Sequence, residues 1–252
     1  MNSATLLIVF APLFTVAWFA FSSACAAASS EDMQKVGDLS VDRTEVTIGQ
    51  FSQYVAATKK RTTAEILGGG LVYDSGWKRM PGWSWRTPFG QKTDTRLPAV
   101  HITFDEAAEY CHWAGKRLPT DLEWQTAAYT ETRTQPKAPF ERGTTYPYPT
   151  GKTPIGANCL SDCGATTAID FSKQLNRGIG PSLVATSKVG INGLYDMAAN
   201  VWEWTEINND NSKGTRGGSW WYGAAPMERN HRATKPRNTA AVYIGFRCVR
   251  SN

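Results

Sequence analysis

The sequence predicts a compact single domain of the α+β class, poor in regular secondary structure and held together by aromatic side chains. Its 252 residues suit one domain with a sizeable core. Its 22 Gly and 13 Pro interrupt periodic elements, whereas its 10 Trp can fix irregular segments to a core. Short stretches with helix or strand periodicity alternate with long irregular ones, without an internal repeat or an interior domain boundary.

The first 28 residues have the features of a signal peptide or an N-terminal anchor. Residues 6–21 carry no charge, and the small residues at 22–28 contain A-x-A cleavage sites. Because no Lys or Arg precedes the apolar run, an uncleaved anchor is the alternative. We therefore expect an exported, periplasmic or extracellular protein with its folded domain at residues 36–252. Only the N-terminal segment is expected to touch a membrane.

Cysteine usage agrees with export, because four cysteines remain after the leader, an even number in an oxidising compartment. Cys159 and Cys163 can close a small loop, and a bridge from Cys111 to Cys248 would tie the middle of the chain to its end. A metal site is the alternative for the close pair, although no second CxxC or His pair lies nearby.

Three helix starts are visible as capping boxes, in which a Thr is followed three residues later by Gln or Glu. Each stands before an apolar pattern with helical spacing, and each predicts one helix. The pairs are Thr47 with Gln50, Thr103 with Glu106, and Thr120 with Glu123.

The remaining segments are expected to be short strands and loops. Strands are predicted at residues 41–46 and 242–249, and a tight turn into a buried aromatic strand at residues 216–222. Residues 68–98 form a long aromatic loop, which we expect to fold onto the surface and to line part of a cleft. Periodicity is weak over residues 136–188, which predicts irregular structure with short strands.

The net charge of +5 is unevenly spread, since residues 213–252 carry eight Lys or Arg against Glu228 alone. This basic third could face an anionic ligand, or its arginines could pair internally. A nucleic-acid partner is not expected, because the chain has no groove-reading motif and is exported.

Residues 193–204 combine two Trp, a Tyr and a Met with Asp196, Asn200 and Glu203. Buried carboxylates require partners, and a turn whose carboxylates and carbonyls wrap a hard cation such as calcium would supply them. The alternative is an ordinary aromatic core segment with two carboxylates at its rim.

Five blocks together resemble the formylglycine-generating enzyme family, also called sulfatase-modifying factors. They are Glu45-Val46-Thr47 followed by Phe51, then residues 110–124, 193–204, 216–220 and 245–248. The resemblance implies a compact α+β fold, distantly like C-type lectins, and a disulfide between Cys111 and Cys248. It also implies structural calcium. The implied ligands of one ion are the side chains of Asp196 and Glu203 with the carbonyls of Ala199 and Val201, and those of a second ion are Asn158 and the carbonyl of Cys159. An Asp expected for the second site has no counterpart near Pro181.

The chain departs from the family at its chemistry. Oxidase members carry a copper-binding cysteine pair at the positions of Tyr222 and Met227, and neither residue can form a thiolate. Another branch, the sulfoxide synthases, binds iron through histidines of an extra helical domain that this chain lacks.

Three functions are compatible with the sequence. The first is an oxidative maturation enzyme that resembles the pyoverdine-maturation branch, with a peptide-like or anionic substrate and a redox metal of unknown identity. Tyr222 and His231 are its candidate catalytic residues, and its cleft residues would be Trp202, Ser219, Trp220, Trp221 and Tyr222. The second is a binding protein without chemistry, and the third is a genuine formylglycine generator with a rewired site. A monomer is expected.

Overall fold

The computed structural model describes residue 1, residues 33–164, residue 175 and residues 179–252. The predicted signal or anchor segment lies outside the described residues. Among the described residues, no helix has the length and apolarity that crossing a membrane requires.

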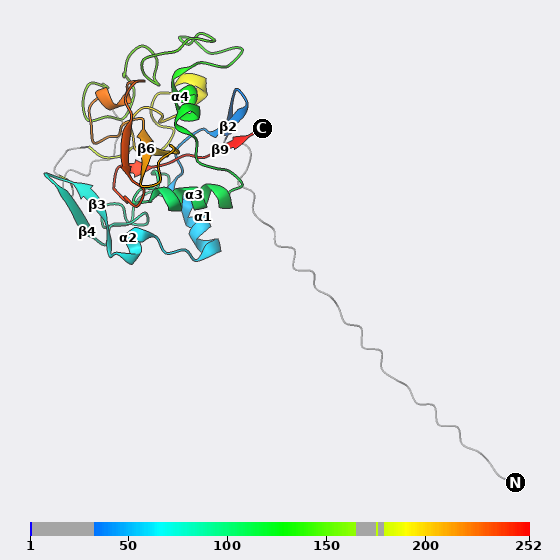
Figure 1. The fold of residues 1–252 in the computed structure, drawn as a ribbon, viewed down its shortest axis with the longest axis vertical. Coiled ribbons are helices and arrows are strands. Elements are labelled where there is room, and N and C mark those ends of the chain that lie inside the picture. Colours follow the sequence, from blue (N-terminus) through cyan, green and yellow to red (C-terminus); the bar gives the residue numbers. More distant parts are fainter. Residues whose placement is uncertain (2–32, 165–174, 176–178) are drawn as a thin grey trace.

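In the described part of the chain, four short helices and nine short strands are joined by long irregular segments (Figure 1). The helices are α1 (Ile48–Thr58), α2 (Thr63–Ile66), α3 (Phe104–Trp113) and α4 (Asp121–Tyr129). The strands are β1 (Met33–Val36), β2 (Leu39–Asp42), β3 (Gly69–Tyr73), β4 (Trp77–Pro81), β5 (Trp202–Thr205), β6 (Ser212–Arg216), β7 (Ala233–Pro236), β8 (Ile244–Gly245) and β9 (Val249–Ser251). The described residues also form the 3-10 turns η2 (Ile191–Gly193) and η3 (Ala225–Met227).

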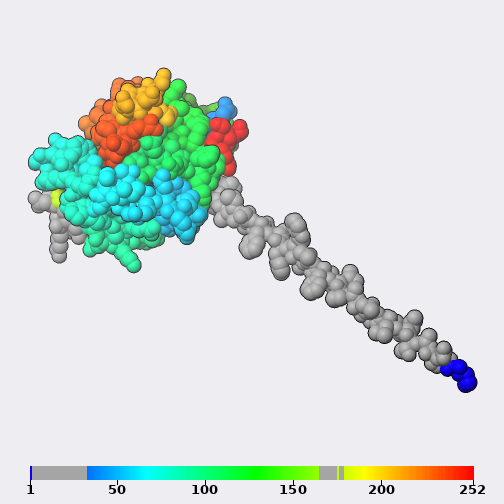
Figure 2. All heavy atoms as spheres, turned by 60° about the horizontal axis from the view of Figure 1, so that its bottom comes forward, coloured from blue at the N-terminus to red at the C-terminus, as the bar shows by residue number. Residues whose placement is uncertain are grey.

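The strands form three small sheets. β1, β2 and β9 make an antiparallel sheet that joins the start of the described domain to the C-terminus. β3 and β4 form a hairpin, with Tyr73 directly opposite Trp77. The third sheet has the order β7-β6-β5-β8, and only its β5–β8 pair is parallel. Figure 2 shows the hairpin, in cyan, at the surface beside orange atoms of the C-terminal third.

The three predicted capping boxes are confirmed. At Thr47, Thr103 and Thr120 the Thr hydroxyl accepts the N3 amide hydrogen, and the N3 side chain accepts the Thr amide hydrogen. This arrangement satisfies two amides that a helix start leaves without a partner. A fourth capping box, at Thr62 and Glu65, starts α2 and was not predicted from the sequence.

The tight turn predicted at the start of residues 216–222 is confirmed, but the buried aromatic strand predicted after it is wrong. β6 ends at Arg216, and Gly217 and Gly218 follow with φ values of 92° and 75°. These left-handed conformations turn the chain out of the sheet, so the next aromatic residues lie in a buried loop. The predicted closing strand at residues 242–249 is likewise interrupted, because β8 and β9 are separated by irregular residues.

The main core is aromatic and lies between α1, α3 and the sheet that contains β5. Trp85, Trp204 and Trp220 are among its fully buried side chains. The Cys111–Cys248 disulfide crosses this core and links α3 to the residues before β9, as the resemblance implied. Cys159 and Cys163 form the second disulfide rather than a metal site.

Candidate functional site

A cluster of buried charges lies where residues 193–204 pack against the end of the chain. The Glu203 carboxylate receives two hydrogen bonds from Arg247, from Nε and Nη2, both at 2.7 Å. The indole Nε1 of Trp124 donates a third at 2.7 Å. Burial works against the charge of Arg247, but Glu203 raises its pKa above the ordinary value. The Arg247 guanidinium therefore stays charged inside the core.

Two more carboxylates share this cluster. Glu45 is fully buried and accepts hydrogen bonds from the side-chain amide of Asn200, at 2.6 Å, and from the backbone amide of Val201, at 3.0 Å. Burial, followed by the charges of Asp196 and Glu203, raises the pKa of Glu45 well above its usual range. Three carboxylates thus face the guanidinium of Arg247. Neither Glu45 nor Arg247 was predicted to belong to a site.

Asp196 is the carboxylate that remains for a cation. It accepts hydrogen bonds from the amide of Ala185, at 2.8 Å, and from the hydroxyl of Ser187. Asp196, Ala199 and Asn200 all have φ between 51° and 60°, so the backbone makes a tight left-handed turn around this side chain.

The donor set suits calcium in charge and ligand type. Among the described residues, no three His, Cys, Asp or Glu side chains are placed to hold a metal by side chains alone. A calcium ion at this turn would therefore depend on backbone carbonyls in addition to Asp196, which is normal for this ion. Glu203 would bind the ion only through carboxylate lone pairs that do not already accept hydrogen bonds from Arg247 and Trp124.

The residues implied for a second calcium site lie in a hydrogen-bonded contact with this turn. The side-chain amide of Asn158 donates to Asn200, at 3.0 Å, and the amide of Asn200 donates to the carbonyl of Asn158, at 3.1 Å. Cys159 follows directly and is held by its disulfide to Cys163.

The two candidate catalytic residues meet at one tryptophan. The ring of Trp202 lies 5.9 Å from that of Tyr222 and 5.8 Å from that of His231. Burial and the charge of Arg216 lower the pKa of His231, so the imidazole is neutral at pH 7. A neutral imidazole can accept a proton from a bound group.

The other residues of the expected cleft are mostly buried. Ser219 and Trp220 are 0% exposed, Trp221 is 3% exposed and Trp202 is 4% exposed. Only Tyr222 is half-buried. The accessible part of the aromatic cluster therefore comes from other segments.

Six rings form what we call the aromatic strip: Tyr73, Trp77, Tyr243, Tyr222, Trp202 and His231. Each ring centre lies within 6.5 Å of the next. The strip is exposed at its β3–β4 end, where Tyr73 and Trp77 keep 46% and 48% of their surface accessible. It is exposed again at His231. The loop predicted at residues 68–98 is wrong for residues 69–81, which form the β3–β4 hairpin. Trp77 of the hairpin reaches the surface as expected, whereas Trp83, Trp85 and Phe89 are buried.

The second disulfide lies beside the positions where the oxidases carry their cysteines. Cys159 and Cys163 pack in one cluster with Ala224 and Met227, and the amide of Leu160 donates to the carbonyl of Tyr222 at 2.9 Å. This proximity could not be predicted from the sequence, because the disulfide loop and Met227 are far apart in the chain. The disulfide loop thus supports the strip at its centre.

Comparison with known proteins decides the family. The model of the sulfatase-modifying factor enzyme 1-like domain matches residues 19–252. The chain belongs to this family. It is 30% identical over 247 residues to a mouse (Mus musculus) protein named inactive C-alpha-formylglycine-generating enzyme 2, covering 86% of this chain and 76% of the relative. It is 28% identical over 255 residues to the formylglycine-generating enzyme of Thermomonospora curvata, covering 83% and 80%.

Solved structures agree on the fold of this family member. PvdO from Pseudomonas aeruginosa superposes with a TM-score of 0.60 at 18% identity, covering 85% of this chain and 80% of that one. CarF gives a TM-score of 0.56 at 21% identity, covering 85% and 86%. The predicted α+β fold, poor in regular structure, is confirmed.

Proposed function

We propose that this protein is an exported, monomeric member of the family that holds a peptide-like ligand at the accessible rings of the aromatic strip and does not perform the cysteine-pair oxidation. Tyr222 and Met227 carry the proposal, because neither side chain supplies the thiolate that a soft copper ion requires. Met227 is also fully buried. The name of the mouse relative, which describes it as inactive, supports the same assignment.

The strip favours an extended ligand over a compact one. Its accessible rings are at its two ends, in the β3–β4 hairpin and at His231, whereas Tyr243 and Trp202 between them are 1% and 4% exposed, so a ligand that reaches both ends must be extended. Tyr and Trp offer large rigid surfaces at a small entropic cost, which suits the apolar side chains of a bound chain. Two disulfides in the domain fit the oxidising compartment that export would provide.

Structural calcium at the Asp196 turn is part of the proposal. Burial and the charges of Asp196 and Glu203 raise the pKa of Glu45, and a divalent cation at the turn would counter this mutual repulsion of the carboxylates. The ion would hold the turn that precedes β5, and β5 begins with Trp202 of the strip. Its role would be to fix the strip rather than to take part in chemistry.

An oxidation without thiols is the second candidate function. The observation that favours it is the placement of Tyr222 and His231 on the same tryptophan ring, with His231 neutral at pH 7. In this case His231 would accept a proton from a substrate bound over Trp202, and a redox metal would supply the oxidation.

One experiment separates the proposed binding function from that of a genuine formylglycine generator. The protein is incubated with copper, oxygen and a Cys-x-Pro-x-Arg peptide, and the peptide mass is followed by mass spectrometry. We expect no change in mass. Conversion of the peptide cysteine to formylglycine would overturn the proposal and restore the formylglycine generator.

A further inference from the structure

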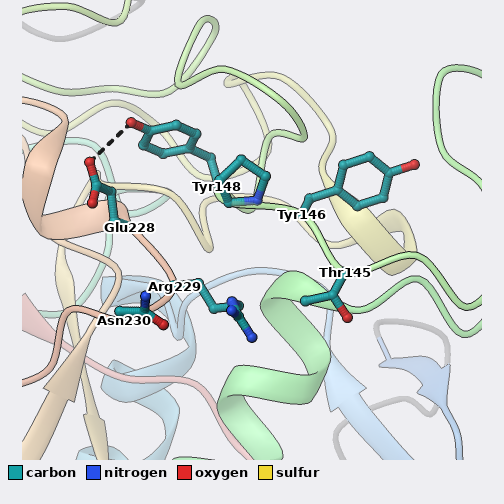
Figure 3. A pocket seen from close by; sticks show the side chains of 7 residues that line it. Thr145, Tyr146, Tyr148, Glu228, Arg229 and Asn230 are labelled. Carbon is teal, nitrogen blue, oxygen red and sulfur yellow. Dashed lines mark hydrogen bonds between the residues drawn. The ribbon is translucent and has the colours of Figure 1, made fainter.

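A separate hollow is formed in part by the residues that directly precede His231. It has a volume of about 490 Å³ and is lined by residues 145–148 and 228–230 (Figure 3). Pockets of roughly 300–1,000 Å³ are typical of small-molecule sites. The ring of Tyr148 lies on one side and Arg229 on the opposite side, with Glu228 at one end; Pro147 also lines the hollow.

The backbone of this hollow is fixed from two directions. The amide of Arg229 donates to the carbonyl of Pro147 at 3.0 Å. The guanidinium of Arg216 donates to the carbonyls of Arg229, at 3.3 Å, and His231, at 2.5 Å. Arg216 is itself 3% exposed and paired with Asp121 at 2.6 Å. The walls are therefore preformed, which reduces the entropic cost of binding.

The two charged side chains in the hollow have no ionic partners in the part of the chain that the structure describes. Glu228 accepts only a hydrogen bond from the Tyr148 hydroxyl at 3.3 Å. Arg229 forms no salt bridge with any carboxylate there, although most other arginines of the basic C-terminal third do. One cavity thus presents an unpaired carboxylate and an unpaired guanidinium beside an apolar surface.

We propose that this hollow binds a small zwitterion, of the class of a free amino acid or a di- or tripeptide. The ligand carboxylate would pair with Arg229, whose planar guanidinium suits a bidentate contact. The ligand ammonium would pair with Glu228, and an apolar side chain would lie on Pro147 and Tyr148. The site is distinct from the aromatic strip and does not depend on the function proposed for it.

The opposite charges select for this ligand class. A simple anion would meet the repulsion of Glu228, and a simple cation that of Arg229, whereas a zwitterion satisfies both. A site whose polar groups would remain unpaired discriminates strongly against analogues that lack one of the partners.

Isothermal titration of the full chain with L-alanyl-L-phenylalanine tests the proposal. The N-acetylated dipeptide, which lacks the ammonium, and the dipeptide amide, which lacks the carboxylate, serve as probes of each charge. We expect the zwitterion to bind and each analogue to bind at least about tenfold more weakly. Glu228→Gln and Arg229→Gln should each lower the affinity for the zwitterion by a similar factor.

Arg250→Gln is the matched control, because Arg250 is an exposed arginine in β9, outside the hollow. It should leave the affinity unchanged, and thermal melts should show that all three variants are folded. No heat of binding at millimolar dipeptide would overturn the proposal. Equal affinity for the three dipeptides, or for the wild type and both pocket variants, would overturn it as well.

Discussion

Removal of calcium is the most informative perturbation of the carboxylate turn. If the turn holds calcium, a chelator leaves three buried carboxylates opposite the single guanidinium of Arg247. An ion that binds only the folded state stabilises it by about 2.7 kcal/mol when its concentration is about 100 times its Kd. For a domain of this size, about 1 kcal/mol shifts the Tm by roughly 2–4 °C. EDTA should therefore lower the Tm by about 5–10 °C.

Asp196→Asn is the variant that tests the assignment. It removes the carboxylate charge at the turn but leaves the Glu203–Arg247 pair intact, which a change of Glu203 would not. Thermal melts in calcium and in EDTA should coincide for this variant. Asp210→Asn, at an exposed position in the loop before β6, should keep the full shift. Equal wild-type melts in calcium and EDTA, or a shift that survives in Asp196→Asn, would refute the reasoning.

Three further predictions concern stability. Burial lowers the pKa of His101 to about 4, so the neutral imidazole stabilises the fold fully above pH 6.5. As the pH falls toward 4, the free energy of unfolding should drop by about 3 kcal/mol, and His101→Asn should flatten this pH profile. A wild-type Tm that stays flat over this range would contradict the prediction. Replacing Cys111 and Cys248 together by Ser should cost about 2–5 kcal/mol in urea unfolding, because this bridge spans 137 residues; an unchanged midpoint would argue against that role. Arg247→Leu should cost about 3–5 kcal/mol, because it leaves Glu203 buried and unpaired, and wild-type stability of this variant would show that the pair is dispensable.

Local features of the fold could be predicted from the sequence. Each capping box involves residues three positions apart, so the starts of α1, α3 and α4 depend on neighbours in the chain. α2 was missed, although its box has the same pattern, because four residues give no apolar periodicity.

Pairings between distant segments could not be predicted in this way. β5 pairs with β8 in parallel, and residues 240–242 pair with Leu71 of the hairpin. Nothing in the local pattern of these segments specifies a partner. The strip depends on these pairings, since they bring Tyr243 between the hairpin and Trp202.

The same limit applies to the charge cluster. Asp196 and Glu203 stand out in the sequence as carboxylates among aromatic residues. Glu45 lies 155 residues before Asn200, its hydrogen-bond partner, and has no local mark of burial. The position of Arg247 could not be predicted either, because nothing in the neighbouring residues indicates that its side chain pairs with Glu203.

Ligand binding at the strip tests the central claim most directly. Peptides selected on the immobilised protein from a random library are labelled, and their affinity for the full chain is measured by fluorescence anisotropy. We predict that Tyr222→Ala and Trp77→Ala each weaken binding by at least about tenfold, as expected for aromatic side chains that become buried under a bound ligand. Leu122→Ala, a change at a 72% exposed apolar residue in α4, should have no effect. Selected peptides that bind both strip variants as tightly as the wild type would contradict the account.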